Sequence, residues 1–330
     1  MKLTEKKTLQ FELWQECNNK CKFCYLGTEN RFTADDIKIA SLKKTIEKIS
    51  DESIFKEYNC LAFIGGEFYQ GQLQNPEVKK WFYKLMDKSA DLLNRGVIEE
   101  FWTTATLTIG KQEDLYNCIE KFNDKSKVWV LTSWDAYGRF HTPKMLETWE
   151  YHMKHLKEKF PNIKLNTTIV LTGIVMEKYL SGEIPSFEQF CEKYNTSLFF
   201  KQPALFLDIR NEYKNSTSEE IQKIGKSKCQ TVIQNFFPTR KTVLKFYSEF
   251  KERETDNMWT RLFNVRYRAD ILERHLNNGE DETSTRNKNF EIIKNYELES
   301  PTMKCGHGCN FAAYIDSDKC WICDKDGFNE

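Results

Sequence analysis

Two kinds of hydrophobic pattern alternate along the first two thirds of the chain. Short apolar or β-branched runs predict six β-strands, at residues 8–14, 60–66, 100–108, 127–133, 164–172 and 197–202. The longer stretches between them are amphipathic and predict helices. Because a crossover between parallel strands needs a helix, six strand–helix units predict a parallel α/β sheet. The pattern fits either an open doubly wound sheet or an open, partial barrel.

Several residues indicate where the predicted helices begin and end. Asn75 and Thr142 each precede a proline, which is typical of an N-cap followed by proline at the first helical position. Thr33 precedes Ala-Asp-Asp and predicts a third capped start, while Gly96 predicts the end of the second helix. Residues 205–300 are charged and also follow a helical pattern.

Composition and charge exclude some classes of function. The 330 residues include 49 basic and 49 acidic side chains, so the chain lacks the basic excess that bulk nucleic-acid binding would need. The first ten residues lack the apolar core of a secretory signal, and no run approaches the roughly 20 apolar residues of a membrane-spanning helix. We therefore expect a cytoplasmic protein that does not bind membranes.

The eleven cysteines are unevenly distributed. Seven fall in two clusters near the ends of the chain, at positions 17, 21 and 24 and at positions 305, 309, 320 and 323. In a cytoplasmic protein such clusters indicate metal binding or catalysis rather than a disulfide framework. The isolated ones are predicted to be small buried hydrophobic residues: Cys60, Cys118, Cys191 and Cys229.

Residues suited to chemistry follow the predicted strands. The first cysteine cluster follows the first strand, a Gly-Gly-Glu segment at 65–67 ends the second, and Ser133 and Asp135 follow the fourth. Because the carboxyl ends of parallel strands share one edge, these residues predict a single site there. His152 and His155, on the helix predicted after the fourth strand, instead predict a solvated helix face.

The first cysteine cluster has the spacing C-x3-C-x2-C, with Cys17, Cys21 and Cys24. Structural zinc takes four protein ligands, and three thiolates without histidine would make zinc a poor Lewis acid. A [4Fe–4S] cluster is normally held by four cysteines, so three would leave one iron open to a small chelating molecule.

The segment CNNKCKFCY, residues 17–25, resembles the cysteine loop of the radical S-adenosylmethionine (SAM) superfamily. The resemblance covers residues 8–204 and implies that family's fold, a partial (β/α)6 TIM-type barrel. It also implies the activity: Cys17, Cys21 and Cys24 hold a [4Fe–4S] cluster whose open iron binds SAM. Reductive cleavage of SAM then yields a 5′-deoxyadenosyl radical that abstracts hydrogen from a substrate. A low-potential electron donor such as flavodoxin or ferredoxin is the partner that such chemistry implies.

The same resemblance assigns a role to the Gly-Gly-Glu segment. Gly65, Gly66 and Glu67 are similar to the family's GGE motif, in which the glycines allow close backbone approach. Glu67 would accept hydrogen bonds from the ammonium group of SAM. Phe68 stands where the family motif usually continues with proline, so the local turn departs from the family pattern.

Other cofactor-binding residues follow from the resemblance. Ser133 and Asp135 would approach the ribose and carboxylate of the cofactor, or the substrate. Thr104 and Thr168 are candidates on the third and fifth strands. Phe23 would flank the adenine or shield the cluster from water.

The tail contains Cys305, Cys309, Cys320 and Cys323 in the spacing C-x3-C-x10-C-x2-C. Two close pairs of cysteines predict a metal site, either structural zinc or a second [4Fe–4S] cluster. The Cys-Gly pair followed by YIDSDKCWIC resembles the SPASM and twitch extensions of radical SAM enzymes. That resemblance favours one auxiliary cluster over zinc.

The predicted organisation is a partial barrel at 1–204, a helical segment at 205–300 and a cysteine-rich metal-binding cap at 301–330. Such extensions accompany peptide modification in the family, so the expected substrate is a peptide or protein. A small metabolite or nucleotide is the alternative substrate. The alternative of another class is a non-catalytic iron–sulfur or zinc scaffold that binds a partner and does not cleave SAM.

Overall fold

The computed structural model describes residues 8–19, 21, 32–201 and 290–294, together with Thr242, Lys245, Phe246 and Glu249. Its strands form one parallel sheet in the order β6-β5-β4-β3-β2-β1-β7. The strands are β1 (Thr8–Glu12), β2 (Cys60–Ile64), β3 (Glu100–Thr104), β4 (Val128–Trp134), β5 (Lys164–Val170), β6 (Ser197–Lys201) and β7 (Phe290–Lys294). The predicted α/β class is confirmed, and each of the six predicted strands is present.

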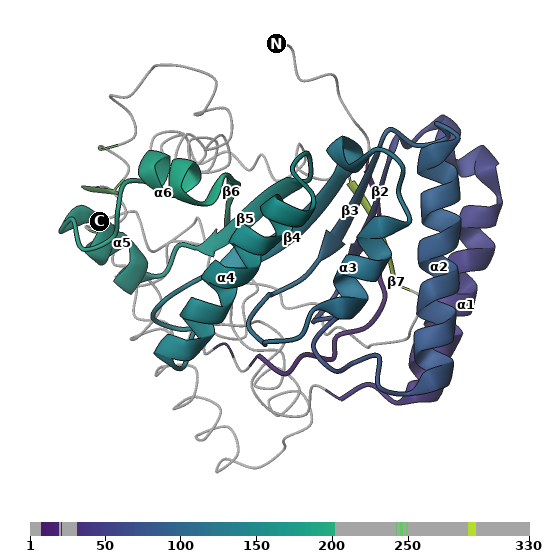
Figure 1. The fold of residues 1–330 in the computed structure, drawn as a ribbon, viewed down its shortest axis with the longest axis horizontal. Helices are drawn as coiled ribbons and strands as arrows, with labels where there is room; N and C mark the ends of the chain where they lie inside the picture. Colours follow the sequence, from purple (N-terminus) through teal and green to yellow (C-terminus); the bar gives the residue numbers. More distant parts are fainter. Residues whose placement is uncertain are drawn as a thin grey trace, which may run out of the picture.

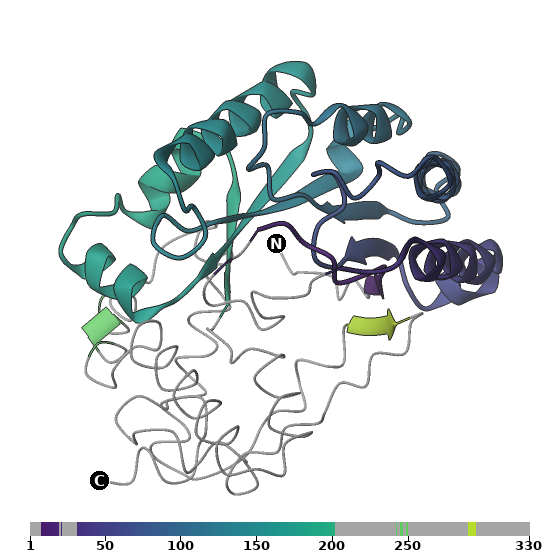
Figure 2. The same ribbon diagram turned by 90° about the horizontal axis from the view of Figure 1, so that it is seen from below.

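Helices connect the strands along the chain. They are α1 (Asp35–Ser50), α2 (Pro76–Asn94), α3 (Glu113–Glu120), α4 (Pro143–Lys159), α5 (Gly173–Leu180) and α6 (Phe187–Tyr194), with 3-10 turns η1 (Glu52–Lys56) and η2 (Lys125–Lys127). Figures 1 and 2 show a curved sheet with α1 to α4 along its outer side. A doubly wound sheet reverses its strand order at a switch point, whereas β1 to β6 lie in sequence order. This arrangement is that of an open, partial barrel.

The seventh strand corrects one prediction. β7 (Phe290–Lys294) lies within the segment predicted to be helical and pairs in parallel with β1. The sheet therefore extends beyond the predicted boundary at residue 204. The sequence FEIIK is short and carries two adjacent isoleucines, so it is compatible with a strand as well as with one helical turn. Its pairing with β1 is a long-range contact that local sequence does not encode.

The outer face of the sheet forms the core under the helices. Along β4, Val128, Val130 and Thr132 are buried, whereas the residues between them are half-buried. The buried set faces outward, since the indole Nε1 of Trp149 on α4 donates to the Thr132 hydroxyl at 3.1 Å. Successive strand residues point to opposite faces, so the half-buried set lies on the inner, concave face.

Two of the predicted helix signals have the expected geometry. The Asn75 side chain accepts the backbone N–H groups of Glu77 and Val78 at the start of α2. Gly96 follows the end of α2 with φ of +77°, a conformation that favours glycine. Thr142 is the N-cap of α4, although its side chain accepts no capping bond.

The predicted cap at Thr33 is wrong. The N-cap of α1 is Ala34, and no side chain caps this helix. The backbone N–H of Thr33 instead donates to the carboxylate of Glu16, at the entrance to the cysteine loop. A contact across 17 residues has therefore displaced the local capping arrangement.

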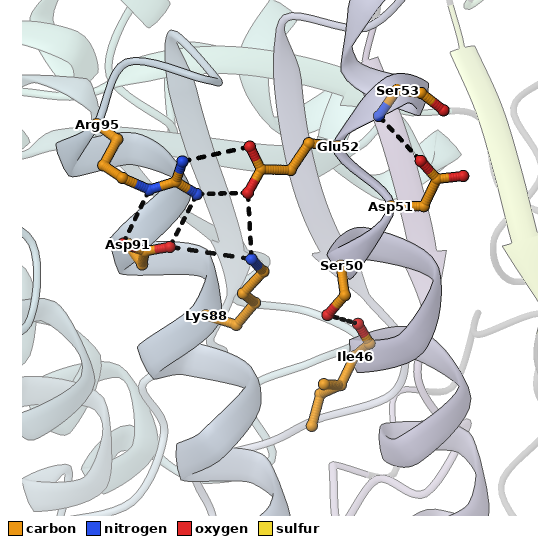
Figure 3. Close-up of polar contacts among 8 residues, drawn as sticks. All are labelled: Ile46, Ser50, Asp51, Glu52, Ser53, Lys88, Asp91 and Arg95. Atoms are coloured by element: carbon orange, nitrogen blue, oxygen red, sulfur yellow. Dashed lines mark hydrogen bonds and ion pairs between the residues drawn. The ribbon is translucent and has the colours of Figure 1, made fainter.

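A surface ion-pair network joins η1 to the end of α2 (Figure 3). The Glu52 carboxylate in η1 accepts from the guanidinium of Arg95, just after α2, and from Lys88 on α2. Asp91 pairs with the same guanidinium. All four groups are exposed or half-exposed, so we expect a modest contribution to stability. The network fixes the end of α2 against η1.

The structure describes three of the four isolated cysteines. Cys60 and Cys118 are fully buried, as predicted, and Cys191 is half-buried. Burial raises the pKa of Cys118, as expected of a thiol in a hydrophobic core. Cys229 lies outside the described residues.

Within the described part of the chain, no helix combines the length and apolar character needed to cross a membrane.

Candidate functional site

The predicted site residues that the structure describes gather at one edge of the sheet. Cys17 and Cys21 follow β1, the Gly-Gly-Glu segment follows β2, and Asp135 directly follows β4. All strands are parallel, so these segments emerge at the same carboxyl edge. Ligand sites of parallel α/β folds lie at this edge.

The cysteine loop is partly described. Cys21 is 2% exposed and Cys17 is half-buried, so two thiols lie four positions apart with different access to water. Cys24 and Phe23 lie outside the described residues, as do Cys305, Cys309, Cys320 and Cys323. In the part of the chain that the structure describes, no three cysteine, histidine or acidic side chains come close enough to bind a metal. The predicted three-cysteine ligand set stays a prediction, because Cys24 is not among the described residues.

Glu16 ties the two ends of the cysteine loop together. Its carboxylate accepts the Thr33 backbone N–H at 3.1 Å and pairs with Lys38 Nζ of α1 at 2.7 Å. Lys38 is 3% exposed, so water screens this ion pair weakly. The residue before Cys17 is thereby attached to the segment that follows the loop.

Gly65 and Gly66 pack against the backbone that leads into the cysteine loop. A Cβ on Gly65 would lie 2.3 Å from the carbonyl oxygen of Trp14, and one on Gly66 would lie 2.2 Å from that of Glu16. Gly66 N–H donates to the Trp14 carbonyl at 3.0 Å, and Glu67 N–H donates to the Glu16 carbonyl at 2.8 Å. The glycines permit close approach of the chain's own backbone, so this segment and the loop form one packed unit.

Glu67 is completely buried, and its two oxygens accept five hydrogen bonds. Oε1 accepts the backbone N–H groups of Phe68 at 2.8 Å and Tyr69 at 3.0 Å. Oε2 accepts the backbone N–H of Thr106 at 2.7 Å, the Thr106 hydroxyl, and Nε2 of Gln70 at 3.1 Å. Burial raises the pKa of Glu67, and the hydrogen bonds act in the opposite direction.

These contacts give Glu67 a structural task that the sequence did not indicate. The carboxylate joins the end of β2 to the segment after β3, through Thr106. The expected pairing of this carboxylate with an ammonium group stays a prediction. Such a contact would require Glu67 to give up hydrogen bonds that it makes here.

Thr104, Ser133 and Thr168 lie on the same inner face. Ser133 is the register partner of Thr168, and Thr104 is the partner of Leu131, two positions before Ser133. All three predicted residues are half-buried. The structure thus brings these hydroxyl side chains together near the carboxyl ends of β3, β4 and β5.

Larger side chains fill the amino-terminal part of the inner face. Glu100 on β3 pairs with Lys164 on β5 at 3.1 Å and accepts the indole Nε1 of Trp102 at 3.1 Å. The rings of Trp102 and Trp129 have centroids 5.6 Å apart, and Lys164 Nζ lies 4.8 Å from the Trp129 ring centroid. This layer leaves the small hydroxyl side chains at the carboxyl half of the face.

Asp135 is buried, and only one of its two carboxylate oxygens accepts hydrogen bonds from the described residues. Oδ1 accepts the backbone N–H groups of Tyr137 and Gly138, both at 2.7 Å. Oδ2 is buried and has no hydrogen-bond partner within the described part of the chain. Burial raises the pKa of Asp135, while the hydrogen bonds and the nearby Arg139 lower it. Because an unpaired buried carboxylate oxygen is costly, Oδ2 is a candidate acceptor for a ligand donor.

Sequence reasoning missed a set of hydrogen-bonded polar residues around the cysteine loop. Asn18 and Asn19, between the first two cysteines, bond to Gln70 and to two threonines of the segment after β3. The available signal was threonine at positions 104, 106 and 108, a pattern that predicts polar side chains on one face of a strand. The chain departs from that strand at Leu107, where φ is +61°.

His152 contradicts the predicted solvated helix face. It is 2% exposed, with Nδ1 2.7 Å from the Tyr116 hydroxyl and Nε2 2.8 Å from the Ile109 carbonyl oxygen. The carbonyl can only accept, so Nε2 carries the proton and Nδ1 accepts from Tyr116. Burial lowers the pKa of His152, because the charged ring would lose its hydration.

The burial of His152 predicts that the stability of the fold decreases in acid. The unfolded chain takes up the histidine proton as the pH falls below 6.5, whereas the folded chain does so only at lower pH. This contribution to stability is therefore complete above pH 6.5 and is lost as the pH decreases. We expect His152→Asn to show a smaller fall in the free energy of unfolding between about pH 7 and about pH 5, measured by denaturant titration. His155→Asn, on the same helix, is the control, and an unchanged pH dependence in His152→Asn would contradict the assignment.

Comparison with known proteins gives only distant likenesses. No protein-family model and no curated protein matches the chain. Among solved structures, Streptococcus suis SuiB bound to S-adenosylmethionine gives a TM-score of 0.42 at 12% identity, covering 91% of this chain and 53% of SuiB. Native and hexahistidine-tagged anSMEcpe, both with bound AdoMet, give TM-scores of 0.44 at 14% identity and cover 84% of this chain.

The matched proteins are longer than the present chain. It spans about half the length of SuiB, and 68% and 66% of the native and tagged anSMEcpe chains. Likenesses at this level assign no activity to the chain.

Proposed function

We propose that the protein is a radical SAM enzyme whose catalytic [4Fe–4S] cluster is held by Cys17, Cys21 and Cys24. The observation that carries the proposal is the position of the cysteine loop. It leaves β1 at the carboxyl edge of a parallel sheet, and its entrance is packed against the Gly-Gly-Glu segment at the end of β2. Both motifs that resemble the family thus meet where this class of fold places its ligands.

The donor chemistry fits an iron–sulfur cluster. Thiolates are the usual cluster ligands, and three of them leave one iron open. The near-complete burial of Cys21 supports a role at a site protected from water. When bound, the cluster and SAM would supply one-electron cleavage of the sulfonium and a radical that abstracts hydrogen from substrate.

The chain's own side chains would bind and orient the ligand. Ser133 and Thr168 present hydroxyls beside each other on the inner face, and Thr104 lies nearby on β3. Asp135 would accept a hydrogen bond from the ligand through its unpaired Oδ2. The Trp102 and Trp129 layer restricts the ligand to the carboxyl half of the face.

Asp135→Asn tests this arrangement. The amide keeps an oxygen for the Tyr137 and Gly138 N–H groups, and it replaces the unpaired acceptor with a donor. We expect SAM binding to the reconstituted protein, measured by equilibrium dialysis, to weaken about tenfold, as loss of a charge-assisted hydrogen bond implies.

Asp124→Asn is the matched control. Asp124 also accepts a backbone N–H, from Ser126, but it lies in a turn before β4 at the opposite edge. SAM affinity should be unchanged in this variant. Equal SAM affinity in the wild type and in Asp135→Asn would show that Asp135 does not bind SAM.

The finer features of the proposal rest on the sequence motifs. The tail motif supports one auxiliary [4Fe–4S] cluster, held by Cys305, Cys309, Cys320 and Cys323, with zinc as the alternative. The resemblance of this tail to SPASM and twitch extensions supports a peptide or protein substrate. A low-potential donor such as flavodoxin or ferredoxin would supply the electron.

A further inference from the structure

A buried chain of hydrogen bonds attaches the cysteine loop to the segment after β3. Asn19 Nδ2 donates to the Thr106 hydroxyl oxygen at 2.6 Å, and the Thr108 hydroxyl donates to Asn19 Oδ1 at 2.7 Å. Asn19 is 3% exposed, and the two threonines are 4% exposed. One side chain between Cys17 and Cys21 is therefore held on both sides by buried hydroxyl groups.

Glu67 sets the direction of these hydrogen bonds. In its ionised form the carboxylate can only accept, so the Thr106 hydroxyl donates to it. The Thr106 oxygen is then available to accept, and Asn19 presents its NH2 group there. The amide orientation that follows directs Asn19 Oδ1 to the Thr108 hydroxyl. Each group thus has a compatible partner.

A second connection runs through Gln70. Its Nε2 donates to Glu67 Oε2 at 3.1 Å, and its backbone carbonyl accepts from Asn18 Nδ2 at 2.7 Å. Its Oε1 lies 2.9 Å from the Thr108 hydroxyl, which has one proton and can give it to only one acceptor at a time. Asn18 is thereby connected to the Glu67 carboxylate through Gln70, and Asn19 is connected to it through Thr106.

We propose that Asn19, Thr106 and Thr108 are positioning residues that hold the cysteine loop in its cluster-binding conformation before the cluster arrives. The reference to a cluster rests on the proposed function, whereas the hydrogen bonds do not. A loop fixed in advance loses less conformational entropy on binding. Its local opening would expose Cys21, which is almost completely buried in the closed form.

The test is the rate at which a maleimide alkylates Cys21 in the metal-free, full-length protein, read from the mass of its peptide. Thr106→Val keeps the shape of the side chain and removes the hydroxyl. We expect it to raise the Cys21 alkylation rate about tenfold, since loss of a buried hydrogen bond raises the open population by that order. Thr106→Ser restores the hydroxyl and should stay within about twofold of the wild type.

Thr167→Val is the matched control. Thr167 is fully buried and shares a 3.0 Å hydrogen bond with the Thr196 hydroxyl, between β5 and β6. Its loss should leave Cys21 alkylation at the wild-type rate, so a general loosening of the fold is separated from release of the loop. A wild-type rate in Thr106→Val, or equal rates in its Val and Ser variants, would overturn the proposal.

Asn19→Ala gives a second variant, on the cysteine loop itself, should Thr106→Val fail to fold. It too is expected to raise Cys21 alkylation about tenfold, and an unchanged rate would overturn the proposal. After reconstitution, both variants should release iron to a chelator faster than the wild type. A wild type that takes up no iron would contradict the proposed function alone, because the alkylation rates are measured without metal.

Discussion

Gly66→Ala is expected to destabilise the protein by roughly 3 kcal/mol and to prevent stable iron binding. The added Cβ would lie 2.2 Å from the carbonyl oxygen of Glu16 and 2.4 Å from that of Gln15. Both neighbours are backbone atoms at the entrance to the cysteine loop, so no side-chain rotation can relieve the overlap. Either the end of β2 or the loop must move, and with it the hydrogen bond from Glu67 N–H to the Glu16 carbonyl.

Gly110→Ala is the control for this prediction. A Cβ at Gly110 would meet nothing within 4 Å. Its free energy of unfolding should change by less than about 0.5 kcal/mol, as for most surface substitutions. Denaturant unfolding of the metal-free proteins measures the first effect, and iron analysis after reconstitution measures the second. Wild-type stability and iron content in Gly66→Ala would contradict the packed unit described here.

Replacing Cys17, Cys21 and Cys24 together by alanine is expected to abolish SAM cleavage and to remove one cluster. If the tail holds an auxiliary [4Fe–4S] cluster, the wild type should bind about eight irons and the triple variant about four. If the tail binds zinc, the triple variant should lose essentially all iron and retain one zinc. Metal analysis of this variant therefore also distinguishes an iron–sulfur cluster from zinc in the tail.

The half-buried Cys191 on α6 provides the control for the loss of a thiol elsewhere. Cys191→Ala should keep the iron content and the SAM cleavage of the wild type. Undiminished iron in the triple variant would show that the first cysteine cluster is not the ligand set.

Most of the sheet could be predicted because its strands carry local signals. The run VWVLTSW of β4 is rich in β-branched and aromatic residues, and the run KLNTTIV of β5 alternates in burial along its first six residues. The cap at Asn75 is equally local, since its side chain bonds two and three residues ahead. The prediction of a cap at Thr33 failed because the Thr33 backbone N–H donates to Glu16, which is distant in sequence.

The site was predictable in its position but not in its internal bonding. The cysteine spacing and the Gly-Gly-Glu triplet identify which segments matter, and parallel strands bring them to one edge. The partners of Glu67 could not be predicted, because Thr106 is 39 residues away and reaches Glu67 only in the folded sheet. Burial of His152 has the same origin, since Tyr116 is 36 residues away.

The most direct test of the proposed function is reductive SAM cleavage by the full-length protein. The chain should be reconstituted anaerobically with iron and sulfide, reduced, and incubated with SAM, and 5′-deoxyadenosine should be quantified against the triple cysteine variant. The proposed function predicts 5′-deoxyadenosine from the wild type and none from the variant. Iron-loaded wild type that binds SAM but forms no 5′-deoxyadenosine would contradict the assignment and favour a non-catalytic iron–sulfur scaffold, whereas equal formation by the triple variant would contradict the assignment of the three cysteines as the catalytic ligands.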